Sequence, residues 1–238
     1  MQNAVENFAA LRGNSYPGRG LVVGKTPNGN NLVQMAWLMG RSENSRNRRY
    51  VHEGNIIRTE AVDPSKVTDP SLIIYNAMRE DMDHYAVTNG DQTDTIFESA
   101  LRGGPDFFVR AMCAREYEPD APNFTPRISA LCGRYRSGLV VTQRAILSRS
   151  PFGTCDRAFY RYSELPKGYG YCVHTYTSDD NPLPSFLDTP RLVPMLNSIV
   201  GVSNYYWGTL NSDNRVALVT KFVAIGTGES KVHIINRH

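Results

Sequence analysis

The chain has 238 residues, of which 41% are hydrophobic and 21% are charged, and its formal net charge is +3. This length and composition fit a globular protein with one sizeable core and exclude a disordered chain. The small charge excess argues against a dedicated nucleic-acid binder, which concentrates many more basic residues. Of the 26 basic residues, 21 are arginines, whose planar fork suits phosphate and carboxylate groups.

The four cysteines are scattered along the chain, at Cys113, Cys132, Cys155 and Cys172. Because none forms a CxxC pair, we expect no metal site, and we expect reduced, mostly buried thiols. No apolar run approaches 18 residues, and the opening MQNAVENFAALRG lacks the regions of a secretion signal. The sequence therefore predicts a cytoplasmic protein with no membrane partner.

The first part of the chain predicts one short helix followed by strands. Residues 2–11 place apolar side chains on one side of a helix. An Asn-Gly turn joins two apolar runs and is typical of a β-hairpin. The predicted strands of this part are GLVVGKT, NLVQMAWLMG, YVHEGNII, SLIIYNAM and HYAVTNG.

Two helices are predicted next, at residues 91–104 and 105–117, with Pro105 in the first turn of the second. Residues 188–210 predict helical pieces that Pro194 and Gly201 interrupt. The remaining strand-like runs are RISALCGRY, GLVVTQRAIL, AFYRY, GYCVHTYT, RVALVTKFVAIG and KVHII. This order favours a single α+β domain over residues 1–238, with largely antiparallel sheets and helices outside them.

Residues 40–50, GRSENSRNRRY, hold four arginines among serines and asparagines. Taken alone, such a run is most often a solvated loop. The uncharged donors between the guanidinium groups also suit a phosphate that is held by several hydrogen bonds. A nucleic-acid surface would need further basic segments with interleaved aromatic residues, and the sequence supplies no clear second patch.

Three other segments place polar residues at element boundaries. Residues 88–96, TNGDQTDTI, predict a turn and a helix cap, and such a turn also offers free N–H groups to an anion. Tyr75 and Asn76 interrupt an apolar strand, where one of the two side chains points inward. Glu118 and Asp120 follow the second predicted helix, although acidic groups are unfavourable at a helix C-terminus. Each segment has a structural explanation as well as a functional one.

Five segments, in this order, resemble the archaeal-type IMP cyclohydrolase family: GRGLVVGKTPNG, RSENSRNR, IIYNAMR, VTNGDQTDTI and YEPDAPNFTPRI. The resemblance covers about residues 16–135, and NG-x-x-TDTI and YE-x-D…N-x-TPRI are its most specific parts. It implies a four-layer αββα fold like that of the N-terminal-nucleophile (Ntn) hydrolases, without their chemistry. It also implies a purine-nucleotide substrate: 5-formamidoimidazole-4-carboxamide ribotide (FAICAR) closes to IMP and water, with no metal or redox cofactor.

The resemblance assigns the catalytic positions to Arg48, Tyr75 and Glu118. Arg48 and Tyr75 would polarise the formyl oxygen and Glu118 would handle the amide proton, although these roles are interchangeable. Arg46 is a rival of Arg48, because the arginine loop is two residues longer than in the family. The predicted substrate-binding residues are Arg41, Asn76, Asn89, Gln92, Thr93, Asp94 and Arg127.

Two other functions stay open, an amide hydrolase acting on a related ribotide and a non-catalytic purine-nucleotide-binding protein. The first needs an internal nucleophile, and no Cys or Ser lies in a recognisable nucleophile motif. The second fits poorly with the presence of all three catalytic candidates. A homo-oligomer also stays open, since SNYYWGTL and the C-terminal strands fit either a subunit interface or, preferably, the core.

Overall fold

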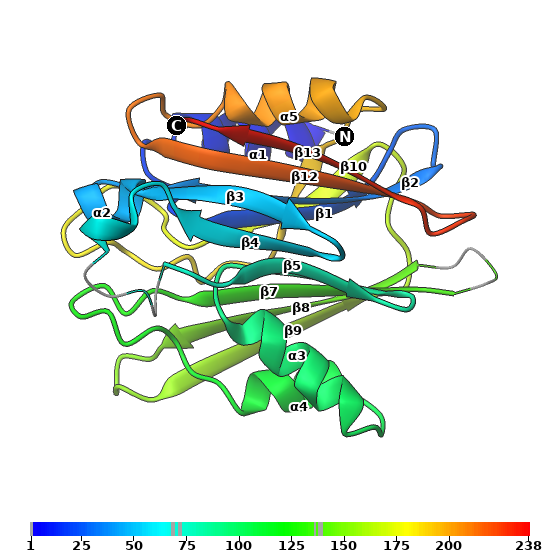
Figure 1. The fold of residues 1–238 in the computed structure, drawn as a ribbon, viewed down its shortest axis with the longest axis horizontal. Helices are drawn as coiled ribbons and strands as arrows, with labels where there is room; N and C mark the ends of the chain where they lie inside the picture. Colours follow the sequence, from blue (N-terminus) through cyan, green and yellow to red (C-terminus); the bar gives the residue numbers. More distant parts are fainter. Residues whose placement is uncertain (1, 68–69, 71–72, 136, 138–139) are drawn as a thin grey trace.

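The structure is a computed structural model that describes residues 2–67, 70, 73–135, 137 and 140–238. It contains two antiparallel sheets (Figure 1). The six-stranded sheet is made of β1 (Gly20–Lys25), β2 (Asn31–Met39), β10 (Tyr169–His174), β11 (Arg191–Pro194), β12 (Arg215–Ala224) and β13 (Ser230–Asn236). Its strand order is β11-β10-β1-β2-β12-β13.

The seven-stranded sheet follows chain order from one edge to the other, β3-β4-β5-β6-β7-β8-β9. It is therefore a meander in which each strand pairs with the next one along the sequence. Its strands are β3 (Arg48–Glu53), β4 (Ile56–Ala61), β5 (Asn76–Asp81), β6 (His84–Thr88), β7 (Arg127–Arg134), β8 (Val140–Arg149) and β9 (Cys155–Tyr162).

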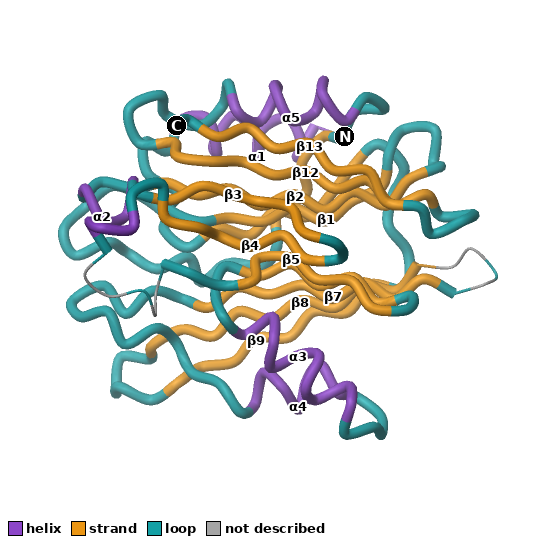
Figure 2. The backbone as a smooth tube through the Cα atoms, in the orientation of Figure 1, coloured by secondary structure: helices purple, strands orange, loops and turns teal. Residues whose placement is uncertain are grey.

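Helices cover the outer face of each sheet (Figures 1 and 2). Helices α1 (Gln2–Gly13) and α5 (Ile199–Trp207) pack on the six-stranded sheet. Helices α3 (Gln92–Leu101) and α4 (Phe107–Cys113) pack on the seven-stranded sheet. Two short pieces, α2 (Glu43–Arg46) and a 3₁₀ turn (Pro64–Lys66), lie in connections. The layers are thus helices, sheet, sheet and helices, with one apolar cluster between each neighbouring pair.

Strand β2 shows how the sequence builds two cores at once. Ala36 and Leu38 belong to the core between the sheets, whereas Met35 and Trp37 belong to the core beneath α1 and α5. Both faces of this central strand are buried, which explains its nearly continuous apolar sequence.

At one edge, a single side chain joins the two sheets by forming the pair of hydrogen bonds that a strand backbone would form. Asn236 of β13 donates its amide N–H to the Tyr50 carbonyl at 3.0 Å and accepts from the Tyr50 backbone N–H at 2.9 Å. Tyr50 lies in β3, at the edge of the other sheet. The pair continues hydrogen bonding across the gap between the sheets and fixes their relative position.

The predicted α+β class with largely antiparallel sheets is confirmed, and so are the first hairpin and the helices near 2–11, 91–104 and 105–117. Several details of the sequence prediction were wrong. YVHEGNII is not one strand, because the chain turns at Gly54, whose φ is 59°, and β4 begins at Ile56. Pro105 precedes the helix cap Asp106 instead of lying in the first turn. The prediction that the thiols are mostly buried was also wrong: of the four free cysteines, only Cys132 and Cys172 are buried.

The region from 188 to 210 also differs from its prediction. Residues 191–194 form an edge strand, β11, and Pro194 lies at its end, where a missing N–H is tolerated. Gly201 lies inside α5, whose start is capped by Ser198 accepting from the Gly201 N–H at 3.1 Å. The predicted strand SLIIYNAM begins as β5 only at Asn76, and residues 71–72 lie outside the described residues.

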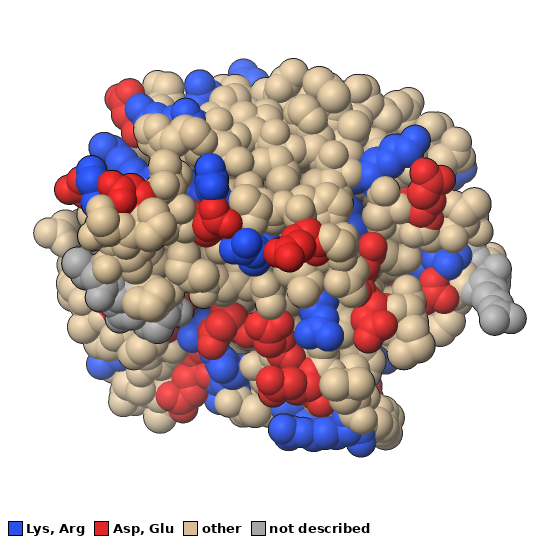
Figure 3. Space-filling model, in the orientation of Figure 1, with Lys and Arg blue, Asp and Glu red and all other residues tan. Residues whose placement is uncertain are grey.

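Acidic and basic side chains are interspersed on the face shown in Figure 3. No helix in the described ranges is both long enough and apolar enough to cross a membrane. The segment SNYYWGTL, for which the sequence allowed either a subunit interface or the core, forms much of α5. It buries Ser203, Tyr206 and Leu210 in the fold.

Gly20 is a position where only glycine fits. It faces Trp37 in the β1–β2 register, and an added Cβ would lie inside the buried indole ring. We expect Gly20→Ala to lower the free energy of unfolding by about 1–3 kcal/mol, because the ring has no room to move in a packed core. Urea unfolding measures this change. Gly226→Ala is the matched control, since nothing lies within 4 Å of its added Cβ; equal effects of the two substitutions would contradict the prediction.

Candidate active site

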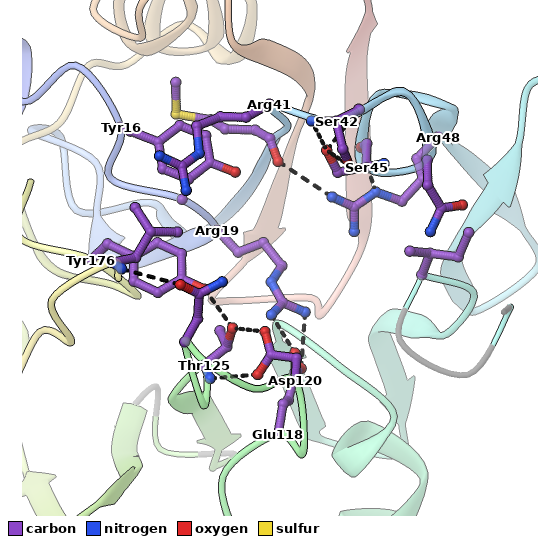
Figure 4. A pocket seen from close by; sticks show the side chains of 16 residues that line it. Tyr16, Arg19, Arg41, Ser42, Ser45, Arg48, Glu118, Asp120, Thr125 and Tyr176 are labelled. Atoms are coloured by element: carbon purple, nitrogen blue, oxygen red, sulfur yellow. Dashed lines mark hydrogen bonds and ion pairs between the residues drawn. The ribbon is translucent and has the colours of Figure 1, made fainter. Parts of the chain in front are cut away.

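A cavity of about 420 Å³ lies where connections from both sheets meet. This volume is within the range of about 300–1,000 Å³ that is common for small-ligand sites. Its wall includes charged residues from three separate connections and from the start of β3 (Figure 4). The lining residues are Tyr16, Gly18, Arg19, Met39, Arg41, Ser42, Asn44, Ser45, Arg48, Ile73, Glu118, Asp120, Asn123, Thr125, Tyr176 and Leu183.

Arg48 places a buried positive charge in this wall. The residue is 4% exposed and begins β3. Its Nε donates to the Ser45 carbonyl at 2.9 Å and its Nη2 to the Met39 carbonyl at 3.3 Å. Burial lowers the pKa of Arg48, but an arginine remains charged at neutral pH. No carboxylate in the described part of the chain forms an ion pair with it, so its charge is available to an anion or a polarised oxygen.

The arginine stretch is therefore not a free loop. Ser42 caps the short helix α2 by accepting from the Ser45 backbone N–H, and Ser45 reciprocates at the Ser42 backbone N–H. This capping box holds the Ser45 carbonyl that orients Arg48. The rival arginine, Arg46, does not line the cavity, because its guanidinium binds the Gly40 carbonyl and Asn214.

Tyr75 lies next to these charges and carries an unused hydroxyl. Its backbone is fixed by Thr59 of β4, which accepts from the Tyr75 N–H at 2.8 Å. Its phenol oxygen is buried and has no hydrogen-bond partner among the described residues. Burial raises the pKa of Tyr75, and the positive charges of Arg19 and Arg48 oppose that shift only in part. The hydroxyl therefore keeps its proton at neutral pH and can donate it in a hydrogen bond.

Glu118 is held by a forked ion pair with Arg19 (Figure 4). The two Nη atoms of Arg19 donate to Oε1 at 2.9 Å and to Oε2 at 2.5 Å. The side chain of Glu118 is 3% exposed, so both partners are largely removed from water. Burial, the largest single effect, lowers the pKa of Arg19, but the Glu118 carboxylate together with the neighbouring Tyr75 and Tyr176 raises it well above its ordinary value. Nη1 of Arg19 also donates to the Asn89 carbonyl at 2.9 Å.

A second polar chain forms another part of the wall. Asp120 accepts from the Thr125 backbone N–H at 2.7 Å and also from the Thr125 hydroxyl. Because a carboxylate only accepts, the Thr125 hydroxyl is left as the acceptor for the Tyr176 hydroxyl beside it. Burial raises the pKa of Tyr176 to about 12, which keeps this donor protonated.

Arg41 lies at the more exposed side of the cavity. Its Nη1 is paired with Asp179 at 2.7 Å, and its guanidinium lies 4.9 Å from the centre of the Tyr16 ring. About a third of each charged side chain is exposed, so the pair is only weakly held.

The other six predicted substrate-binding residues do not line the cavity. Their polar groups are occupied by hydrogen bonds within the protein. The pairs are Asn76 with Asp94, Gln92 with Asn89, Thr93 with Thr88, and Arg127 with Gln92 and Asp91. These residues form a network around the start of α3, on the side of Glu118 that Arg127 faces at 3.8 Å.

Sequence reasoning did not single out several residues of the cavity. Arg19 lies in the run GRG, within the first segment that resembles the family, but it belongs to none of the most specific motifs. Tyr16 and Tyr176 were missed because isolated tyrosines usually belong to the core. Residues beyond 135 matched no motif, yet Tyr176 and Leu183 line the cavity. Within the described residues, no group of three or more His, Cys, Asp or Glu side chains could hold a metal ion.

His174 makes the stability of this region depend on pH. Its buried ring contacts the Tyr176 carbonyl at 2.9 Å, and burial lowers the pKa of His174 from 6.5 to about 4. Between these values the unfolded chain binds a proton that the folded chain does not. We therefore expect the free energy of unfolding to fall by up to about 3 kcal/mol from pH 6.5 to pH 4.

Chemical unfolding measured across this pH range tests the effect of His174. His174→Gln should flatten the profile, whereas replacing the exposed His52 by Gln should leave it unchanged. A wild-type profile that is flat from pH 6.5 to pH 4 would contradict the assignment.

Comparison with known proteins agrees with the sequence resemblance and extends it. The model of a family described as IMP cyclohydrolase-like protein matches residues 16–228. An IMP cyclohydrolase of Haloquadratum walsbyi is 28% identical over 137 residues, which cover 57% of this chain and 66% of the relative. One of Methanothrix thermoacetophila is 34% identical over 132 residues, or 55% of this chain and 60% of the relative.

A third relative, the IMP cyclohydrolase of Methanocella arvoryzae, is 33% identical over 146 residues, covering 59% of this chain and 69% of its own. The chain thus spans less than two thirds of the length of the first two relatives. The family match is longer, since it reaches residue 228 and takes in all the lining residues of the cavity. The chain belongs to the IMP cyclohydrolase-like protein family.

Proposed function

We propose that the protein is an IMP cyclohydrolase that closes FAICAR to IMP with loss of water. One observation carries the proposal: Arg48, a buried cation with no acidic partner among the described residues, lies at the same cavity as the buried carboxylate Glu118. It also lies close to the Tyr75 hydroxyl, which the described residues leave without a hydrogen-bond partner. These groups are the ones that the reaction needs, namely donors for a developing oxyanion and an acceptor for a proton.

Ring closure begins when the carboxamide nitrogen of the substrate attacks its formyl carbon. An amide nitrogen is a poor nucleophile, so holding the two groups in contact lowers the barrier by several kcal/mol. As the C–N bond forms, the formyl oxygen gains negative charge. Arg48 and Tyr75 donate hydrogen bonds to that oxygen, and Glu118 accepts the proton that leaves the carboxamide nitrogen.

Loss of water completes the ring. Glu118 returns the carboxamide proton to the former formyl oxygen, which becomes a hydroxyl. The formamido nitrogen then gives up its hydrogen to form the ring C=N bond, and this second proton passes to the hydroxyl, which leaves as water. The residues of the chain therefore supply the acid, the base and the oxyanion donors for these steps. A reaction that uses no metal or redox cofactor, as expected here, requires all three from the protein.

The phosphate ester of the nucleotide is assigned to the more exposed side of the cavity. Arg41 is the more exposed cation there, and exchanging the exposed Asp179 carboxylate for a phosphate is favourable because a phosphate accepts from the guanidinium fork in the same way. The network residues Asn76, Asn89, Gln92, Thr93, Asp94 and Arg127 contribute to substrate binding by holding the walls in place.

The layer order and the shared cores support a single Ntn-hydrolase-like domain over residues 1–238 as part of the proposal. The amide hydrolase gains no support, because the described cavity wall offers serines that cap α2 and no cysteine. A non-catalytic nucleotide-binding protein would use the same cavity, and only turnover separates it from the enzyme.

Incubating the purified protein with FAICAR and following IMP by absorbance tests the proposal. We expect turnover by the wild type, a fall in kcat of about 10²-fold or more for Tyr75→Phe, and of about 10²–10⁴-fold for Glu118→Gln. Arg49→Gln is the matched control for Arg48→Gln, because Arg49 follows it in β3 but pairs with Glu60 on the surface. Tight IMP binding without turnover would favour the non-catalytic protein, and full activity of both Tyr75→Phe and Glu118→Gln would refute the site.

Gly90 connects the network to Glu118. An added Cβ would lie 2.6 Å from Gln92 Oε1, 2.8 Å from Arg127 Nη1 and 3.2 Å from Glu118 Oε1. These are side-chain ends, so Gly90→Ala should displace the catalytic carboxylate and leave the fold intact.

We expect Gly90→Ala to lower kcat/KM at least about tenfold, since misplacing a reacting group by about 1 Å is costly, while the melting temperature changes little. Gly133→Ala is the control, because its added Cβ meets only ordinary contacts at 3.8 Å or more. Wild-type kinetics in folded Gly90→Ala protein would contradict the supporting role of the network.

A further inference from the structure

We propose that Arg19 is a positioning residue for ring closure: it clamps Glu118 so that the carboxylate keeps one oxygen, Oε2, turned to the reacting amide. The inference rests on the proposed function and assigns a role to a residue that the sequence motifs did not mark. The observation behind it is the forked ion pair between Arg19 and Glu118 in the wall of the cavity.

The ion pair bridges two parts of the fold. Arg19 immediately precedes β1 of the six-stranded sheet, whereas Glu118 lies in the connection between α4 and β7 of the other sheet. Glu118 is also fixed through its backbone, whose N–H donates to the Thr125 carbonyl at 2.9 Å. A long connection of this kind has no strand pairing of its own to orient a side chain, so the guanidinium fork supplies the orientation.

The two carboxylate oxygens have different surroundings. Oε1 accepts from Arg19 Nη1 at 2.9 Å and faces Arg127 Nη1 at 3.8 Å. Oε2 accepts only from Arg19 Nη2 among the described residues. An ionised carboxylate offers about two acceptor positions on each oxygen. Each oxygen therefore retains one free position, but Arg127 faces Oε1, so we assign Oε2 as the atom that takes the amide proton.

Arg19 also acts on the neighbouring groups of the site. Its Nη1 donates to the Asn89 carbonyl, which links the clamp to the network at the start of α3. Its charge lies close enough to Tyr75 to lower the pKa of that hydroxyl, against the larger effect of burial. Its ion pair with Glu118 leaves Arg48 as the buried guanidinium of the cavity without a carboxylate partner in the described ranges.

A purely structural ion pair is the competing explanation, because breaking any buried pair leaves an uncompensated charge and destabilises the fold. A double-mutant cycle separates the two roles. The variants are Arg19→Gln, Glu118→Gln and the double variant, with kcat, KM and melting temperature measured for each in the full chain.

If Arg19 acts through Glu118, Arg19→Gln lowers kcat by about 10²-fold with KM changed less than about threefold. The double variant is then no slower than Glu118→Gln alone, because the group that Arg19 positions is already disabled. Arg19→Lys, which keeps the charge if the Gln variant fails to fold, restores only part of the activity, since an ammonium group cannot hold both oxygens in the same way.

Arg134→Gln is the matched control. Arg134 lies at the other end of β7 from Arg127, pairs with Asp83 at 2.5 Å and reaches the Ile225 carbonyl at 3.2 Å. Breaking the ion pair between Arg134 and Asp83 should lower the melting temperature and leave kcat of the folded protein unchanged.

The outcomes are distinct. Wild-type kcat in folded Arg19→Gln, or losses that multiply in the double variant, would overturn the positioning role and leave the proposed function standing. Absence of IMP formation by the wild type would overturn the proposed function and this inference together.

Discussion

The site depends on one buried ion pair. Arg19 and Glu118 come from connections of different sheets, and each is fixed by the other and by main-chain hydrogen bonds. A buried carboxylate is stable only when it is paired and hydrogen-bonded. With the charge of Glu118 compensated in this way, Arg48 is the buried guanidinium of the cavity wall that has no carboxylate partner among the described residues. The two guanidinium groups of the cavity wall therefore differ: Arg19 is paired within the protein, and Arg48 faces the cavity without such a pair among the described residues.

The rest of the fold provides rigid supports for that division. Helices cover both outer faces of the sandwich; one apolar cluster holds the sheets against each other, and two others hold the helices on the sheets. The cavity lies in the connections at the strand ends, where polar backbone and side chains reach the surface without disturbing the cores. Glycines at two tight contacts, Gly20 against Trp37 and Gly90 against the Glu118 cluster, let these parts approach closely.

Much of the fold could be predicted because the strands carry local signals. The Asn-Gly hairpin and the apolar runs of β6, β7 and β12 were readable in the sequence. The edge strand β11 was not, because four residues ending in Pro194 have too short a pattern to distinguish strand from broken helix. For the site, motifs indicated Arg48, Tyr75 and Glu118. Arg19 and Tyr176 could not be found in this way, since their roles arise only when segments about 100 and 58 residues from Glu118 fold against it.

The way in which Arg48 is held has a consequence for the history of this loop. Its guanidinium is bound by the carbonyls of Met39 and Ser45, and every amino acid supplies a carbonyl. The orientation of Arg48 is thus set by the path of the main chain, which the capping box of Ser42 and Ser45 holds in place. Substitutions in this stretch, or an insertion that bulges outward, can be tolerated as long as α2 returns the chain to the same two carbonyl oxygens. Such a site can stay constant in three dimensions while its local sequence diverges, and motif searches lose it before the chemistry is lost.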